Sequence, residues 1–206
     1  GRSHWAPPAL SGAPENTPER STTMGEYFTP TFLNSAGDIV GALDPQDYGS
    51  GLKLAGHSRA DSRLMYAVQT VLALDGGARL VWAGDYAAAE PGHRANLYFL
   101  IQERHFLRFE GLIGAGVRPN RTLPRGNRAG VFGYVCNADK QHYLENLTLP
   151  IDDTGWRRTP LPWLTAECAP LDEGAGAGSL GSWARDRLYY TQCHPGPDWT
   201  PVAPAL

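Results

Sequence analysis

The clearest candidate for chemistry is Asp85, which stands between Gly84 and Tyr86 directly after the apolar segment 79–83. A carboxylate just past the end of a buried strand lies where open α/β sheets place metal or substrate groups. The neighbouring glycine permits a close backbone approach. In that position Asp85 would serve as a general acid or base, or as a metal ligand. The simpler alternative is a carboxylate that caps an ordinary turn.

Histidines could complete a site around Asp85. The candidates are His57, His93, His105 and His142, with Glu103 as a further carboxylate. No pair has the i, i+4 spacing with an intervening glutamate that defines a zinc-binding helix, so we expect no metal site and no cofactor. The enzyme hypothesis assigns catalytic roles to Asp85, His57 and His142. Ordinary surface or core histidines are the alternative.

A second candidate is an anion-binding loop, because residues 118–128 carry four arginines and no acidic residue. These are Arg118, Arg121, Arg125 and Arg128. Guanidinium groups bind phosphates and carboxylates through paired hydrogen bonds. The loop has no aromatic side chain on which bases could stack, and the chain uses Arg for nearly all its basic residues. A solvated loop is therefore the alternative interpretation.

The composition excludes several classes of protein. The chain has 206 residues, 42% of them hydrophobic and 19% charged, so global disorder is excluded. The net charge of −3 argues against a generally nucleic-acid-binding surface. We expect no membrane association, because apolar runs are short and the N-terminus lacks the apolar segment of a signal peptide. Three scattered cysteines favour a reducing, cytoplasmic location.

The elements that position these residues are mostly short strands. Apolar side chains at positions 64, 68, 71 and 72 predict one amphipathic helix over about 61–74. Pro30 lacks an amide donor, which predicts an edge position for its strand. The predicted fold class is α+β, with mostly antiparallel β-hairpins and this one main helix. The predicted strands are 27–33, 39–43, 79–83, 131–136, 141–145 and 187–191, with one or two more in 96–109.

A weak internal repeat links the two hairpins. Each has an asparagine at its turn, Asn34 or Asn137, and each is followed by a strand that begins with arginine, Arg79 or Arg187. The asparagines lie 103 positions apart and the arginines 108. The pattern is consistent with duplication of a hairpin–strand unit, with half-repeats 24–110 and 129–193. Coincidence is the alternative, because such turns are common in hairpins.

Pro-rich ends flank the predicted domain. Residues 1–23 predict an extended arm or leader, residues 24–193 one domain, and residues 194–206 a tail. Met24-Gly25-Glu26-Tyr27, Gly51-Leu52-Lys53-Leu54 and Ala83-Gly84-Asp85-Tyr86 resemble a family of short uncharacterised actinobacterial and phage proteins. The segment 181–187 is similar as well. The family has no established activity, so the resemblance implies a start at Met24 and no functional residues.

Three hypotheses about function follow from these patterns. The favoured one is a non-enzymatic interaction or assembly module that binds a protein partner or itself, because no catalytic grouping stands out. The second is a small enzyme that uses Asp85 with a histidine. The third is a phosphate or nucleic-acid binder that acts through the Arg118–Arg128 loop.

Overall fold

A computed structural model describes residues 26–110, 121–123, 132–169 and 177–202. The strands are β1 (Phe28–Leu33), β2 (Ile39–Ala42), β3 (Ala78–Gly84), β4 (Leu107–Phe109), β5 (Arg121–Leu123), β6 (Tyr134–Asn137), β7 (His142–Glu145), β8 (Ala166–Glu167), β9 (Arg187–Thr191) and β10 (Thr200–Pro201). The α-helices are α1 (Leu54–His57), α2 (Arg63–Leu72), α3 (Leu97–Leu100) and α4 (Leu161–Thr165). Short 3₁₀ turns cover Pro45–Tyr48, Glu103–His105, Asn146–Thr148 and Ala177–Ser179.

One mixed sheet organises the fold. Its strand order is β10-β7-β6-β9-β3-β1-β2, and β8 pairs with β3 outside this path. The pairs are antiparallel except β10–β7 and β8–β3. Strands β4 and β5 form a separate parallel pair. The predicted α+β class with mostly antiparallel hairpins is confirmed.

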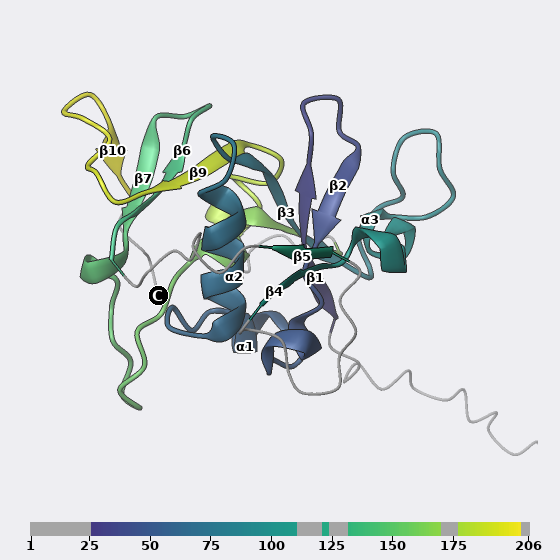
Figure 1. Cartoon of the computed structure of the whole chain (residues 1–206), viewed down its shortest axis with the longest axis horizontal. Helices are drawn as coiled ribbons and strands as arrows, with labels where there is room; N and C mark the ends of the chain where they lie inside the picture. Colours follow the sequence, from purple (N-terminus) through teal and green to yellow (C-terminus); the bar gives the residue numbers. More distant parts are fainter. Residues whose placement is uncertain (1–25, 111–120, 124–131, 170–176, 203–206) are drawn as a thin grey trace, which may run out of the picture.

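The two hairpins occupy equivalent places on either side of the central strands (Figure 1). The β1–β2 hairpin lies against β3, and the β6–β7 hairpin lies against β9. β3 and β9 pair antiparallel at the centre, where Arg79 lies directly opposite Arg187. Arg79 lies opposite Leu33, the residue before Asn34, whereas Asn137 itself lies opposite Leu188, the residue after Arg187. The two hairpin–strand units therefore differ in register, and duplication stays a prediction.

Pro30 lies in an inner strand, so the prediction of an edge position was wrong. Its carbonyl accepts a hydrogen bond from the Leu43 amide at 3.0 Å, one residue beyond β2. In an antiparallel strand, the N–H and C=O of one residue face the same neighbour. The missing N–H of Pro30 therefore also faces the side on which β2 has ended, and β1 keeps its full pairing with β3.

Helix α2 forms where the apolar periodicity predicts a helix. The Ser62 hydroxyl begins it by accepting a hydrogen bond from the Met65 amide at 3.1 Å. Leu64, Val68 and Leu72 are fully buried against the sheet. Each such side chain contributes roughly 1.5–3 kcal/mol through burial. Figure 1 shows the helix lying between the two hairpin–strand halves.

The other face of the sheet carries a smaller core formed by Leu33, Val81, Ala83 and Leu97. Leu97 belongs to α3, although its alternating sequence predicts a strand. The Asn96 side chain starts this helix by accepting a hydrogen bond from the Phe99 amide at 3.3 Å. Of the strands expected in 96–109, only β4 forms. No helix within the described residues is both long and apolar enough to cross a membrane.

Candidate functional site

Asp85 binds the backbone of Tyr27 directly beyond the paired ends of β1 and β3. Its Oδ1 accepts a hydrogen bond from the Tyr27 amide at 2.9 Å, and its own amide donates to the Tyr27 carbonyl at 3.0 Å. The Asn96 side chain donates to the Asp85 carbonyl at 2.9 Å. These contacts extend the strand ladder past Gly84. They are the contacts that the simpler, turn-capping interpretation predicts.

His57 is part of the core. Its Nε2 lies 2.6 Å from the Gly51 carbonyl, and its Nδ1 lies 2.9 Å from Nε1 of Trp82. Because the indole N–H can only donate, Nδ1 is the acceptor and Nε2 carries the proton. Burial lowers the pKa of His57, and the hydrogen bond to Gly51 only partly opposes this. The imidazole is therefore neutral, fully buried and paired at both nitrogens.

The structure does not bring Asp85, His57 and His142 together. Trp82, which binds His57, faces the larger core with α2, whereas Val81 and Ala83 face the opposite side of the sheet. His142 begins β7, which β6 and β9 separate from β3 in the sheet. No described contact therefore joins these three residues into a catalytic group.

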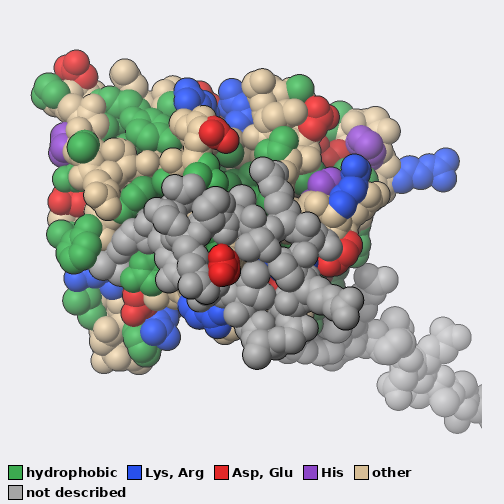
Figure 2. Space-filling model, viewed as in Figure 1, with side chains coloured by type: hydrophobic (Ala, Val, Ile, Leu, Met, Phe, Trp, Pro, Cys, Tyr) green, Lys and Arg blue, Asp and Glu red, His purple; other side chains and the backbone are tan. Residues whose placement is uncertain are grey.

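The arginine loop lies largely outside the described residues. Arg118, Arg125 and Arg128 fall in the undescribed segments 111–120 and 124–131. Of Arg121 only the backbone is described, at the start of β5. Anion binding by these four residues therefore stays a prediction. The surface visible in Figure 2 carries side chains of both charge signs, interspersed with one another.

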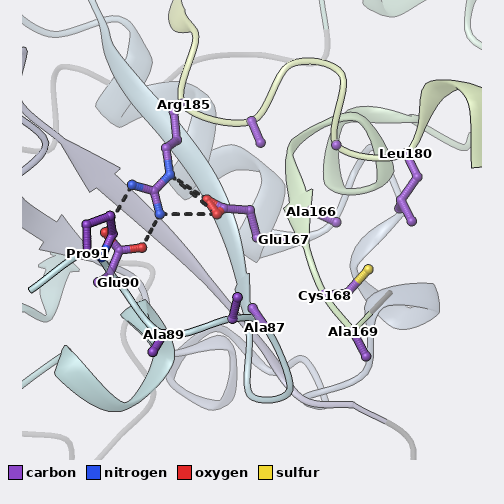
Figure 3. A pocket seen from close by; sticks show the side chains of 13 residues that line it. Ala87, Ala89, Glu90, Pro91, Ala166, Glu167, Cys168, Ala169, Leu180 and Arg185 are labelled. Atoms are coloured by element: carbon purple, nitrogen blue, oxygen red, sulfur yellow. Dashed lines mark hydrogen bonds and ion pairs between the residues drawn. The ribbon is translucent and has the colours of Figure 1, made fainter. Parts of the chain in front are cut away.

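A cavity of about 620 Å³ lies beside the end of β3 (Figure 3). Three segments line it: part of the loop 86–95, hereafter the pocket loop, residues 166–169 around β8, and residues 180–185. Its walls are mostly small side chains. Six of the lining residues are alanine: Ala87, Ala88, Ala89, Ala166, Ala169 and Ala184.

Arg185 joins two of these segments across the cavity (Figure 3). Its Nε donates to Glu167 Oε1 at 2.5 Å and its Nη2 to Glu167 Oε2 at 3.2 Å. Its Nη1 donates to Glu90 Oε2 at 3.1 Å, and Nη2 also donates to Glu90 Oε1. The guanidinium of Arg185 therefore forms paired hydrogen bonds with each of the two carboxylates. These contacts raise the pKa of Arg185 further, so its charge is permanent.

The backbone of Arg185 adopts a conformation that side-chain-bearing residues rarely use. Its φ is 67°, and a left-handed residue other than glycine costs roughly 1–2 kcal/mol. Hydrogen bonds on both sides hold it there. The Arg185 amide donates to Leu80 at 3.0 Å, and Arg79 Nη1 donates to the Arg185 carbonyl at 2.8 Å. Backbone strain of this kind is concentrated at functional sites.

Gly84 lets β8 approach the end of β3 closely. A Cβ at this position would lie 2.6 Å from the Glu167 carbonyl and 3.0 Å from Oε2 of Glu26. The close approach expected for the glycine beside Asp85 is therefore the approach of β8 and of the Glu26 carboxyl. Glu26 Oε1 accepts a hydrogen bond from the Ala169 amide at 3.0 Å, while Oε2 is buried and has no hydrogen-bond partner among the described residues. Burial raises the pKa of Glu26, and the charge of Asp85 adds to this effect.

The polar side chains of the cavity are mostly carboxylates held by Arg185. No histidine is found among its described lining residues. Burial and the nearby Glu26 raise the pKa of the Cys168 thiol, which keeps it from forming the reactive thiolate. Both glutamates already accept hydrogen bonds from Arg185. Within the described part of the chain, no group of three or more His, Cys, Asp or Glu side chains is placed to hold a metal ion.

Sequence reasoning did not identify this cavity. Arg185 and Glu90 are 95 residues apart, and Arg185 and Glu167 are 18 apart. The segment 181–187, which resembles the actinobacterial and phage family, contains Arg185, but nothing in its spacing points to the two glutamates. Comparison of the chain with protein-family models, curated proteins and solved structures gave no match.

Proposed function

We propose that this protein is a non-enzymatic interaction module whose pocket binds a cationic group, either an ammonium or a guanidinium. The observation that carries the proposal is the unequal charge in the cavity. Two carboxylates, Glu90 and Glu167, face a single guanidinium, Arg185. A second cation in the pocket would make the cluster electrically neutral.

The two carboxylates keep the capacity to bind such a group. A carboxylate has about four lone-pair positions. Glu90 accepts two hydrogen bonds from Arg185, and Glu167 accepts three, two of which share the Nε–H donor. The side chains of Glu90 and Glu167 are 13% and 27% exposed, so part of their hydration is already lost. Charge-assisted hydrogen bonds are stronger at such sites than in open water.

The other hypotheses have less support. The enzyme hypothesis needs an acid or base that is free to act, and Asp85 and His57 are both held by backbone or core partners. The anion-binding hypothesis rests on arginines outside the described residues. We further propose a reducing, cytoplasmic location, with which the free thiols of Cys136, Cys168 and Cys193 agree. We also propose that the chain belongs to the actinobacterial and phage family that it resembles.

The test is titration of the ¹⁵N-labelled protein with Nα-acetyl-L-argininamide, hereafter argininamide, monitored by amide chemical shifts. We expect saturable shifts in residues 86–91, 166–169 and 180–185. The neutral isostere Nα-acetyl-L-citrullinamide should bind at least about tenfold more weakly, because it lacks the charge-assisted hydrogen bonds. Added salt should weaken the binding of argininamide.

Two variants localise the effect. Glu167→Gln should weaken argininamide binding about tenfold, since it removes one carboxylate charge. Asp61→Asn is the matched control, because Asp61 is a half-exposed acid paired with an arginine elsewhere, Arg59. Equal binding of the charged and neutral amides, or shifts confined to the surroundings of Asp61, would refute the proposal.

A further inference from the structure

Two residues with exposed aromatic side chains adjoin residues that line the acidic pocket. Tyr86 directly precedes the lining residues 87–89 and is 49% exposed. Trp163 is 37% exposed, and its indole N–H donates to the Ser179 hydroxyl at 3.2 Å. Its carbonyl accepts a hydrogen bond from the amide of Gly181, which lines the cavity. Aromatic side chains are enriched at protein interfaces and supply much of their binding energy.

We infer that the occupant of the pocket is a polypeptide segment of a partner protein, with one Arg or Lys in the cavity and apolar side chains on either side of it. This inference rests on the proposed function, because the basic side chain supplies the cationic group. Its apolar neighbours would pack against the exposed side chains of Trp163 and Tyr86. The charge of the pocket complements the basic residue, and the same charge disfavours nucleic acid.

The cavity is larger than one cationic group needs. Its volume of about 620 Å³ falls within the range of sites that enclose whole small molecules, roughly 300–1,000 Å³. The charged groups lie together at Arg185, whereas most of the remaining lining is alanine, proline or leucine. A basic side chain with an aliphatic stem matches both parts, since its methylene groups can lie along the alanines.

The partner must be recognised by its side chains, not by added strand pairing. β8 pairs with β3 on one side. A Cβ on Gly181 would lie 2.7 Å from the Ala166 carbonyl, so Gly181 lies directly over the backbone of β8. An added strand would have to displace this segment. Specificity should therefore depend on the residues next to the basic side chain.

The experiment compares Nα-acetyl-L-argininamide with two blocked pentapeptides by calorimetry, so that each ligand carries the guanidinium as its single charge. One peptide has arginine flanked by leucines, acetyl-Ala-Leu-Arg-Leu-Ala-amide, and the other has glycines in place of the leucines. We expect the leucine peptide to bind about tenfold more tightly than argininamide or the glycine peptide. Trp163→Ala should remove most of this gain and change argininamide binding less than about twofold. Tyr86→Ala should have the same kind of effect and serves as the second variant if Trp163→Ala does not fold.

Trp156→Ala is the matched control, because Trp156 is 38% exposed and stacks under Arg59 away from the pocket. It should leave all three affinities unchanged. If argininamide binds but the leucine peptide gains nothing, or if Trp156→Ala removes the gain as well as Trp163→Ala, this inference is overturned and the proposed function stands. If neither peptide nor argininamide binds, both are overturned.

Discussion

Acid should destabilise this protein through one buried side chain, His57. Its Nδ1 accepts the indole N–H of Trp82, and its Nε2–H donates to the Gly51 carbonyl. A second proton on the ring would have to sit on Nδ1, opposite a group that can only donate. Protonation of the folded state therefore breaks the bond to Trp82 and places a charge in the core.

The sign and size of the effect follow from proton binding. The pKa of His57 in the folded protein is lower than its ordinary value of 6.5. Above that pH the ring is neutral in both states and contributes no pH dependence. Below it the unfolded chain binds a proton that the folded protein resists, so stability falls by at most about 1.4 kcal/mol per pH unit. Between pH 6.5 and 5.0 this amounts to at most about 2 kcal/mol, or roughly 4–8 °C in Tm.

The assay is urea denaturation followed by far-ultraviolet circular dichroism at several pH values from 7.5 to 5.0. His57→Gln should lower stability at pH 7.5, because its amide fits the two partners less well, and it should flatten the decline below pH 6.5. His142→Gln is the control, since His142 is only partly buried in β7. Burial and Arg104 also lower the pKa of His105, so the difference between wild type and His57→Gln is the quantity to measure. An unchanged pH dependence in His57→Gln would refute the reasoning.

Three further predictions concern stability and motion. Gly77→Ala should destabilise by more than about 2 kcal/mol or prevent folding, as judged by thermal denaturation, because φ is +98° and the new Cβ would lie 2.0 Å from the Leu188 carbonyl. Asn146→Leu should cost about 1–3 kcal/mol by leaving the buried Gln69 side chain without its 2.9 Å hydrogen bond. Adding Gln69→Leu should recover part of that loss in a double-mutant cycle, and strictly additive losses would contradict a shared bond. Arg185→Lys keeps the positive charge but loses the paired hydrogen bonds to Glu90. Amide hydrogen exchange in the pocket loop should therefore become about tenfold faster. Unchanged exchange would show that other contacts hold the loop.

Local sequence signals account for much of the fold. The turn at Asn34 forms because its side-chain oxygen accepts hydrogen bonds from the amides of Ala36 and Asp38. Asn137 does the same for Asp139 and Lys140. These contacts involve neighbours in the chain, so residue types and spacing were enough to predict both hairpins. Where the packing partner lay far away, as for α3, the alternating pattern pointed to the wrong element.

The sequence by itself determined β1, β2, β3, β6, β7 and β9, with their hairpins, and helix α2, because periodicity and turn chemistry act over a few residues. Tertiary structure alone decided which polar groups meet. It gave His57 two core partners, Trp82 and Gly51, and it brought Glu90 and Glu167 to Arg185 from distant segments. Contacts of this kind depend on how the sheet and loops are assembled in space, and no local spacing encodes them.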